Sequence, residues 1–197
     1  MNKISFVQKF TVAEAFDLSR LMQTMHAFFT ENPETYATAL ERKTGDYSIF
    51  VYSHSQDKMN DLADYVESNR YLRQVSMIDR VRSVPSNVNL VEYRRVRIPS
   101  PLKLESDCEY YEHLINNFDK DSWKLKSSEK RQELLDKAGG MRHIHMKSSS
   151  SGNAFRITVK KNKVHQSCTS SGEPDSYGFS GKEHTVLVPD PLSIFDY

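Results

Sequence analysis

The chain has 197 residues, two cysteines, a mean hydropathy of −0.64 and a formal net charge of +1. No apolar run approaches the roughly 20 residues of a membrane span, and Cys108 and Cys168 form no CxxC pair, so a membrane protein, a disulfide framework and a cysteine zinc site are not supported. We expect a soluble, cytoplasmic protein made of two halves that pack on each other.

Charge is unevenly distributed along the sequence. Residues 70–104 contain eight Lys/Arg against two Asp/Glu, and residues 141–165 contain six against none, whereas the rest of the chain is acidic. Two basic stretches indicate a localised polyanion site, because phosphate contacts need cations on one face only. The same pattern also fits two solvated strand faces, and charge alone does not decide between them.

The N-terminal 30 residues predict a strand followed by an amphipathic helix. Residues 2–10 are expected to form the strand, and Thr11 is expected to cap the helix. Over residues 12–30 apolar side chains recur at helical spacing, and the helix ends before a proline. His26 lies one residue off this apolar stripe. This position alone favours a histidine that packs within the helix over a catalytic one.

A hairpin and a second helix are predicted next. Residues 36–41 and 47–52 flank a turn composition and indicate the hairpin, Ser55 is expected to cap the helix, and a strand is expected at 72–81. The resulting order, β-α-β-β-α-β, is the ferredoxin-like split βαβ pattern. We therefore expect an α+β fold with a ferredoxin-like domain over residues 1–85.

The second half, residues 86–197, is predicted to be a smaller α+β domain. Ser100-Pro101 has the composition of a helix start, and the next 40 residues are expected to be mostly helical. Ser/Gly-rich loops join the strands of this half. Those strands are expected at residues 90–98, 141–147, 154–161 and 184–189.

A serine run precedes one of these strands. Ser148 to Gly152 are followed by Ala154-Phe155-Arg156, which opens a basic strand. The run is either a flexible loop or a set of hydroxyls and backbone N–H groups beside a phosphate, where a nucleophile is held in line. Phe155 is either a core residue or a platform on which a base stacks.

Several ordered motifs together carry a family resemblance. The run SSSSGNAFR at 148–156, followed by DSYGFS at 175–180 and VLVP at 186–189, resembles the type I-F CRISPR RNA-processing endoribonuclease. His26 stands late in the first predicted helix, where that family keeps its catalytic histidine. The segment YRRVR at 93–97 is similar to the one that leaves the family's first domain and reads bases of the repeat hairpin. The resemblance spans the whole chain.

The resemblance implies a metal-independent cleavage that needs no cofactor. His26 is expected to handle protons while a ribose 2′-OH attacks the adjacent phosphate, which leaves a 2′,3′-cyclic phosphate. Ser148 is expected to hold the 2′-OH in line, and Ser150 to assist its positioning. Tyr177 is expected to orient the imidazole or the nucleotide.

The same resemblance implies the RNA contacts. Phe155 is expected to stack on the terminal base pair of the hairpin, and Arg95 and Arg97 to contact bases, although the family usually has glutamine in place of Arg97. The family's arginine-rich helix is not matched over residues 101–119, and cations return only after it. The RNA-binding residues are therefore expected to be Arg95, Arg97, Phe155, Arg156, Lys124, Lys130 and Arg131.

The expected partner is a CRISPR repeat RNA hairpin, cut at its base and then kept bound within a type I-F surveillance complex with other subunits. The free protein is expected to be monomeric. One alternative is a non-catalytic subunit that binds the hairpin, which the missing arginine face motivates. Another is a metal-dependent hydrolase built on His143 and His145, with His165 or His184 as a third ligand, which no Hx3H spacing or acidic partner supports.

Overall fold

The computed structural model describes residues 4–32, 36–43, 45–96, 129, 132–133, 141–148, 151–164, 169–181 and 184–195. Packing groups residues 1–95 and 142–197 into one compact unit and residues 96–141 into a second. The predicted domain boundary at residue 85 falls inside the first unit and stays a prediction. The helical stretch expected after Ser100-Pro101 lies outside the described residues, apart from Glu129, Gln132 and Glu133, which are helical.

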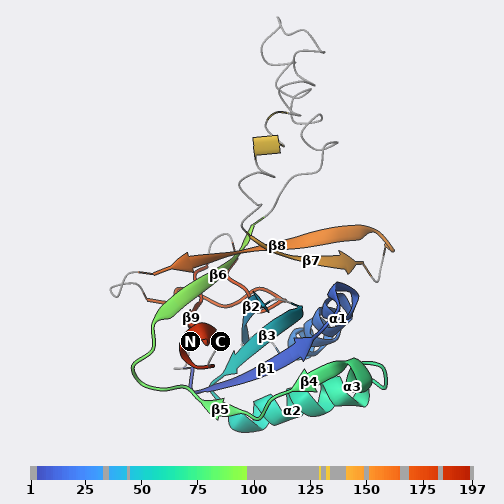
Figure 1. Ribbon diagram of the computed structural model, residues 1–197. Helices are drawn as coiled ribbons and strands as arrows, with labels where there is room; N and C mark the ends of the chain where they lie inside the picture. Colours follow the sequence, from blue (N-terminus) through green and yellow to red (C-terminus); the bar gives the residue numbers. More distant parts are fainter. Residues whose placement is uncertain are drawn as a thin grey trace, which may run out of the picture. The chain divides into compact units, whose positions relative to one another are not determined.

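The first sheet and its helices follow the predicted order. The elements are β1 (Phe6–Val12), α1 (Ala15–Glu31), β2 (Ala37–Lys43), β3 (Asp46–Ser53), α2 (Gln56–Ser68), α3 (Leu72–Val75), β4 (Ser76–Ile78) and β5 (Arg82–Ser83). Across the sheet the strands run β2-β3-β1-β4, β5 also pairs with β1, and these pairs are antiparallel. The fold is α+β with antiparallel sheets, consistent with the predicted ferredoxin-like pattern (Figure 1).

The two long helices form where the sequence pattern places them. The apolar stripe of α1 is buried from Leu18 to Phe29, although Phe16 in the first turn is exposed. The Ser55 side chain caps α2 by accepting the backbone N–H of Lys58 at 3.4 Å, as predicted. His26 is half-buried beside the α1 stripe, at its edge. None of the described helices combines the length and the apolar content that a membrane span requires.

Two local predictions in this half differ from the structure. Thr11 does not cap α1, because it belongs to β1 and its buried hydroxyl lies 3.4 Å from that of Ser48 on the paired strand. The strand predicted over residues 72–81 forms only in part, because residues 72–75 are the short helix α3 and β4 covers only residues 76–78. The cause is Asn69, whose side-chain oxygen accepts the backbone N–H groups of Tyr71 at 3.1 Å and Leu72 at 3.2 Å and so starts a helical turn.

The second sheet contains the strands expected from the C-terminal half. They are β6 (Leu90–Val96), β7 (Arg142–Lys147), β8 (Ala154–Lys163) and β9 (Leu187–Pro189), in the order β7-β8-β6-β9, followed by the 3₁₀ turn Pro191–Ser193. The three basic strands are confirmed over their described residues. The last strand is shorter than predicted, because Thr185 instead bridges to Ser171 outside the sheet.

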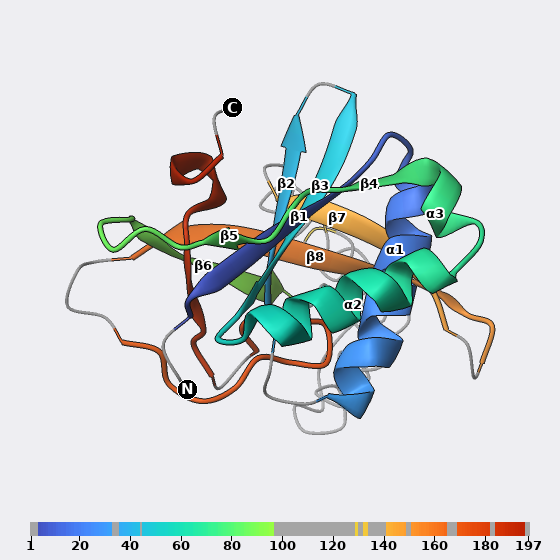
Figure 2. The ribbon, with the colours of Figure 1, turned by 90° about the horizontal axis from the view of Figure 1, so that it is seen from below.

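The first sheet is covered on both faces. In β3 every residue from Ser48 to Ser53 is buried, although alternate side chains point to opposite faces. On one face, the Phe50 and Phe195 rings lie 5.1 Å apart and the Tyr52 hydroxyl donates to the Pro189 carbonyl at 2.8 Å. Figures 1 and 2 show α2 on one side of the sheet and β7 and β8 on the other.

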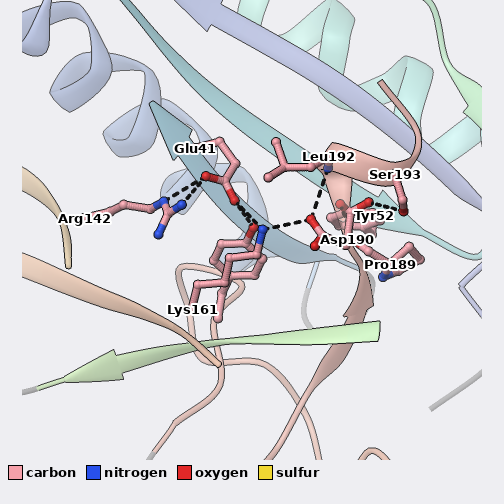
Figure 3. A network of polar contacts seen from close by, with 9 residues as sticks. Glu41, Tyr52, Arg142, Lys161, Pro189, Asp190, Leu192 and Ser193 are labelled. Atoms are coloured by element: carbon pink, nitrogen blue, oxygen red, sulfur yellow. Dashed lines mark hydrogen bonds and ion pairs between the residues drawn. The ribbon is translucent and has the colours of Figure 1, made fainter. Parts of the chain in front are cut away.

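A buried carboxylate joins the two sheets. Glu41 of β2 is 4% exposed, and its Oε1 accepts from Lys161 Nζ at 2.8 Å and from the Tyr93 hydroxyl. Its Oε2 accepts from Arg142, with 3.0 Å to Nε, and Lys161 also reaches Asp190 at 2.8 Å (Figure 3). The donors come from β6, β7 and β8, so one acidic side chain is the acceptor for three strands of the opposite sheet.

Candidate active site

His26 contacts a turn that lies far from it in the sequence. Its Nδ1 is 2.7 Å from the carbonyl oxygen of Ser176, and its ring stacks on Tyr177 with centroids 4.1 Å apart and an interplanar angle of 15°. The predicted pair of His26 and Tyr177 is therefore in direct contact. The two contacts fix both the position and the plane of the imidazole.

The contact with Ser176 also determines which ring nitrogen is available. A carbonyl oxygen only accepts, so Nδ1 of His26 is the atom that donates, and a neutral ring then has its lone pair on Nε2. Among the described residues, Nε2 has no recorded hydrogen-bond partner. The geometry thus presents a half-buried imidazole whose unprotonated nitrogen can take a proton.

The turn under His26 is held by its own backbone and by Asp175. The Asp175 N–H donates to the Phe179 carbonyl and the Gly178 N–H donates to the Asp175 carbonyl, both at 2.8 Å. Asp175 Oδ1 accepts the N–H groups of Tyr177 at 2.9 Å and Phe179 at 3.0 Å. Short polar side chains favour turns by such local hydrogen bonds. The turn is consequently well defined without regular secondary structure.

The same turn is anchored to β2 through Thr38. The Thr38 N–H donates to the Gly178 carbonyl and its hydroxyl donates to the Tyr177 carbonyl, both at 2.8 Å. Gly178 has a φ of +82°, and a Cβ at this position would lie 2.6 Å from Thr38 Cγ2. Only glycine fits this close approach in a left-handed conformation. The first sheet therefore fixes the turn that holds His26.

Arg95, predicted to contact bases, lies beside the same tyrosine. Its guanidinium carbon is 5.1 Å from the centroid of the Tyr177 ring, and its Nη1 is 3.4 Å from Asp175 Oδ2. Burial raises the pKa of Tyr177, and Asp175 adds to this effect while Arg95 opposes it. The phenol therefore stays protonated at neutral pH, and its neutral ring stacks on the imidazole.

Ser148 lies at the end of β7, where a tight loop begins. Its N–H donates to the Asn153 carbonyl at 2.8 Å, its carbonyl accepts from Gly152 at 2.9 Å, and its hydroxyl accepts the Ser151 N–H at 3.3 Å. Gly152 has a φ of +70°. The serine run is thus an ordered turn between β7 and β8 where it is described. Ser150 lies outside the described residues.

Helix α1 is tied to this loop next to Ser148. The Gln23 amide donates to the Lys147 carbonyl at 2.9 Å, and Gln23 stands three positions before His26, which places both on one helix face. Two elements that carry predicted catalytic residues, α1 and the end of β7, are therefore connected one peptide away from Ser148. The sequence pattern gave no signal for Gln23, because a glutamine on a half-exposed helix face is ordinary.

The remaining RNA-binding predictions have different outcomes. Phe155 opens β8, lies opposite Met146 and is half-buried against the core, whereas Arg156 is exposed opposite His145. Their RNA contacts stay predictions. The other predicted contacts lie outside the described residues, and these are Arg97, Lys124, Lys130 and Arg131.

His143 and His145, considered as metal ligands, both lie on β7. His143 Nδ1 lies 3.2 Å from the Thr158 hydroxyl, and His145 is exposed two residues further along β7. Over the described part of the chain, no cluster of three or more His, Cys, Asp or Glu side chains has a geometry that could hold a metal ion. His165 lies outside it.

Comparisons with known proteins assign the chain to a family. The Cas_Csy4 family, described as CRISPR-associated protein, matches residues 3–190. No curated protein matches the chain. A crystal structure named after a chlorite dismutase is 14% identical, with 82% of this chain and 80% of that chain covered and a TM-score of 0.30, and so weak a likeness carries no argument. On the family match, which covers nearly the whole sequence, the chain belongs to the Cas_Csy4 family of CRISPR-associated endoribonucleases, which process CRISPR repeat RNA.

Proposed function

We propose that this protein cuts a folded CRISPR repeat RNA at the base of its hairpin by attack of a ribose 2′-OH, with His26 as the group that moves protons and without a metal ion. The observation that carries this proposal is the fixed imidazole. Its Nδ1 donates to the Ser176 carbonyl at 2.7 Å and its ring stacks on Tyr177, so Nε2 is oriented for proton transfer.

The proposed reaction is an internal transfer. Nε2 of His26 accepts the proton of the 2′-OH, the 2′ oxygen forms a bond to phosphorus, and the bond from phosphorus to the 5′ oxygen breaks. The departing 5′ oxygen takes up a proton, so the products carry a 2′,3′-cyclic phosphate and a 5′-OH. Because the substrate supplies its own nucleophile, the protein needs only to align it, move protons and offset developing charge.

The other residues have roles around this step. Ser148 holds the 2′-OH in line and Ser150 assists, which is supported for Ser148 by its place at a loop that Gln23 ties to the His26 helix. Tyr177 orients the imidazole through its stacked ring. Phe155 stacks on the last base pair of the hairpin.

RNA binding is assigned to cations on several elements. Arg95 and Arg97 contact bases, which is supported for Arg95 by a guanidinium placed beside the tyrosine of the active site. Arginine suits this task because its fork of donors matches a guanine edge or a phosphate. Phosphate contacts come from Arg156, Lys124, Lys130 and Arg131. The cut hairpin stays bound, and the protein joins a type I-F surveillance complex as a monomer.

A cleavage assay with three proteins tests the proposal. The host's own repeat RNA is incubated in EDTA with the wild type, with His26→Ala and with His54→Ala, in which an exposed histidine after β3 is removed as a control. We expect the wild type and His54→Ala to cut and leave a cyclic phosphate, and His26→Ala to bind the hairpin without cutting it.

Other outcomes point elsewhere. Equal loss of binding and cleavage in His26→Ala would make His26 a structural residue. Intact RNA with all three proteins, while binding is retained, would favour the non-catalytic hairpin-binding subunit. Cleavage that requires a divalent ion would contradict the metal-independent mechanism.

A further inference from the structure

One carboxylate in the active-site turn serves two neighbours at once. Asp175 Oδ1 accepts two backbone N–H groups, from Tyr177 at 2.9 Å and Phe179 at 3.0 Å. Its other oxygen, Oδ2, lies 3.4 Å from Nη1 of Arg95. Oδ1 therefore stabilises the turn itself, whereas Oδ2 contacts the Arg95 side chain of β6.

The inner oxygen determines what His26 contacts. The turn that it closes carries the Ser176 carbonyl and the Tyr177 ring, and both contact the imidazole. The turn is also held by Thr38, but Oδ1 of Asp175 is the acceptor that keeps the Tyr177 N–H satisfied. Without that acceptor the peptide beside the imidazole loses a hydrogen bond and its fixed orientation.

The outer oxygen determines where Arg95 points. The Arg95 side chain is 38% exposed and has several rotatable bonds, so a guanidinium without a partner would sample many positions. Asp175 and the face of Tyr177 together restrict it, and the Arg95 N–H is bonded to the Ser180 carbonyl at 2.9 Å. Among the described residues one Arg95 donor, Nη1, contacts the carboxylate, which leaves the rest of the fork for a base edge or a phosphate.

We propose that Asp175 is a positioning residue that couples RNA contact at Arg95 to the placement of the His26 imidazole. The inference rests on the proposed function, and it adds a residue to which neither the sequence pattern nor the resemblance gave a role. Through Asp175, the element that contacts the RNA and the turn that orients the proton-transfer group share one side chain. The binding of a base at Arg95 and the orientation of the His26 imidazole therefore depend on each other.

Two substitutions at this position separate the two oxygens. Asp175→Asn keeps an oxygen for the Tyr177 and Phe179 N–H groups but replaces the anion that faces Arg95 with a neutral group. Asp175→Ala removes both interactions. Asp64→Asn, at an exposed carboxylate of α2, is the matched control and is expected to behave as the wild type. For each protein the measurements are the Kd for the host's repeat hairpin and the rate of single-turnover cleavage at saturating protein.

The expected results differ between the two variants. Asp175→Asn raises Kd by about 2–5-fold, as expected for the loss of a partly exposed ion pair. Asp175→Ala raises Kd to a similar extent and in addition lowers the saturated rate by about 10–100-fold, because the imidazole is no longer aligned. In the background of Arg95→Gln, Asp175→Asn has no further effect on Kd, since the two residues act through one contact.

Specific outcomes overturn the inference. If Asp175→Asn binds as tightly as the wild type, or if its effect on Kd persists in full with Arg95→Gln, the contact with Arg95 has no role in binding. If Asp175→Ala remains folded by circular dichroism and cuts at the wild-type rate when saturated, the turn does not depend on the carboxylate. If the wild type itself neither binds nor cuts the RNA, the proposed function fails, and the inference fails with it.

Discussion

The carboxylate between the two sheets makes a quantitative prediction about stability. Glu41→Gln keeps the shape of the side chain but removes the charge that faces Arg142 and Lys161, and it brings an amide donor toward a tyrosine hydroxyl that now donates to Glu41. Removing one partner of a fully buried pair costs about 3–5 kcal/mol. Arg142 is 25% exposed and Lys161 is 15% exposed with a second partner in Asp190, so water and that partner recover part of the loss.

We therefore expect Glu41→Gln to lower the free energy of unfolding by about 2–3 kcal/mol, a large share of the 5–15 kcal/mol typical of a domain. For a chain of this size the melting temperature should fall by about 4–12 °C. Urea unfolding at pH 7, followed by circular dichroism, measures the change, and the slope m should stay at its wild-type value.

The matched control for this measurement is Asp61→Asn. Asp61 lies 3.8 Å from Lys58 on α2, and both side chains are about half exposed, so its loss should cost less than about 1 kcal/mol. If Glu41→Gln is no more destabilising than Asp61→Asn, the buried network makes no net contribution. The reasoning from burial would then be refuted.

Three further predictions follow from the site and its surroundings. Gln23→Ala should lower the saturated cleavage rate by about tenfold or more with little change in hairpin affinity. The reason is that the substitution removes the hydrogen bond between α1 and the Lys147 carbonyl beside Ser148. A larger change in Kd than in rate would contradict this. Gly178→Ala should cost about 2–4 kcal/mol in urea unfolding, from the left-handed backbone and the contact with Thr38. Gly45→Ala, with a φ of +91° and open space around it, should cost only the backbone part, about 1–2 kcal/mol. Burial and the neighbouring Glu41 raise the pKa of Tyr93 far above its usual 10.0, so the stability that its protonation contributes is complete below pH 10 and is lost as the pH rises above it. Tyr93→Phe should flatten the fall of unfolding free energy above pH 10, and an unchanged slope would contradict the assignment.

The sequence predicted those elements whose signals are local. The hairpin β2–β3 was predicted from apolar runs on both sides of a turn composition that contains Gly45, and α2 was predicted from its Ser55 cap. The strand predicted at 72–81 forms only at 76–78, because four of its residues form a helix and periodicity cannot separate these states over so short a run. The signal that could have separated them is Asn69, a residue that favours helix starts.

The candidate site was predicted only in part, for a related reason. The family resemblance predicted that Tyr177 orients either the His26 imidazole or the nucleotide, and the structure brings its ring into contact with the imidazole. The residues that hold them in place, Thr38 and Asp175, were not predicted. The bond from Thr38 to the turn and the contact between Asp175 and Arg95 join segments far apart in the chain, whereas the bonds of Asp175 inside the turn are local. A turn composition with an aspartate two residues before Tyr177 was visible, but nothing local indicated what the turn supports.

The distance along the chain between His26 and Ser176 has a consequence for when activity first appears. The two residues are 150 positions apart, so the imidazole lacks its contacts until residue 176 and its turn have been synthesised. During translation the first sheet can fold while its histidine is still unoriented, because domains fold as their residues emerge from the ribosome. A nascent or prematurely terminated chain that stops before the turn therefore carries the histidine but lacks the assembled site. Cleavage activity should appear only after translation has passed this turn.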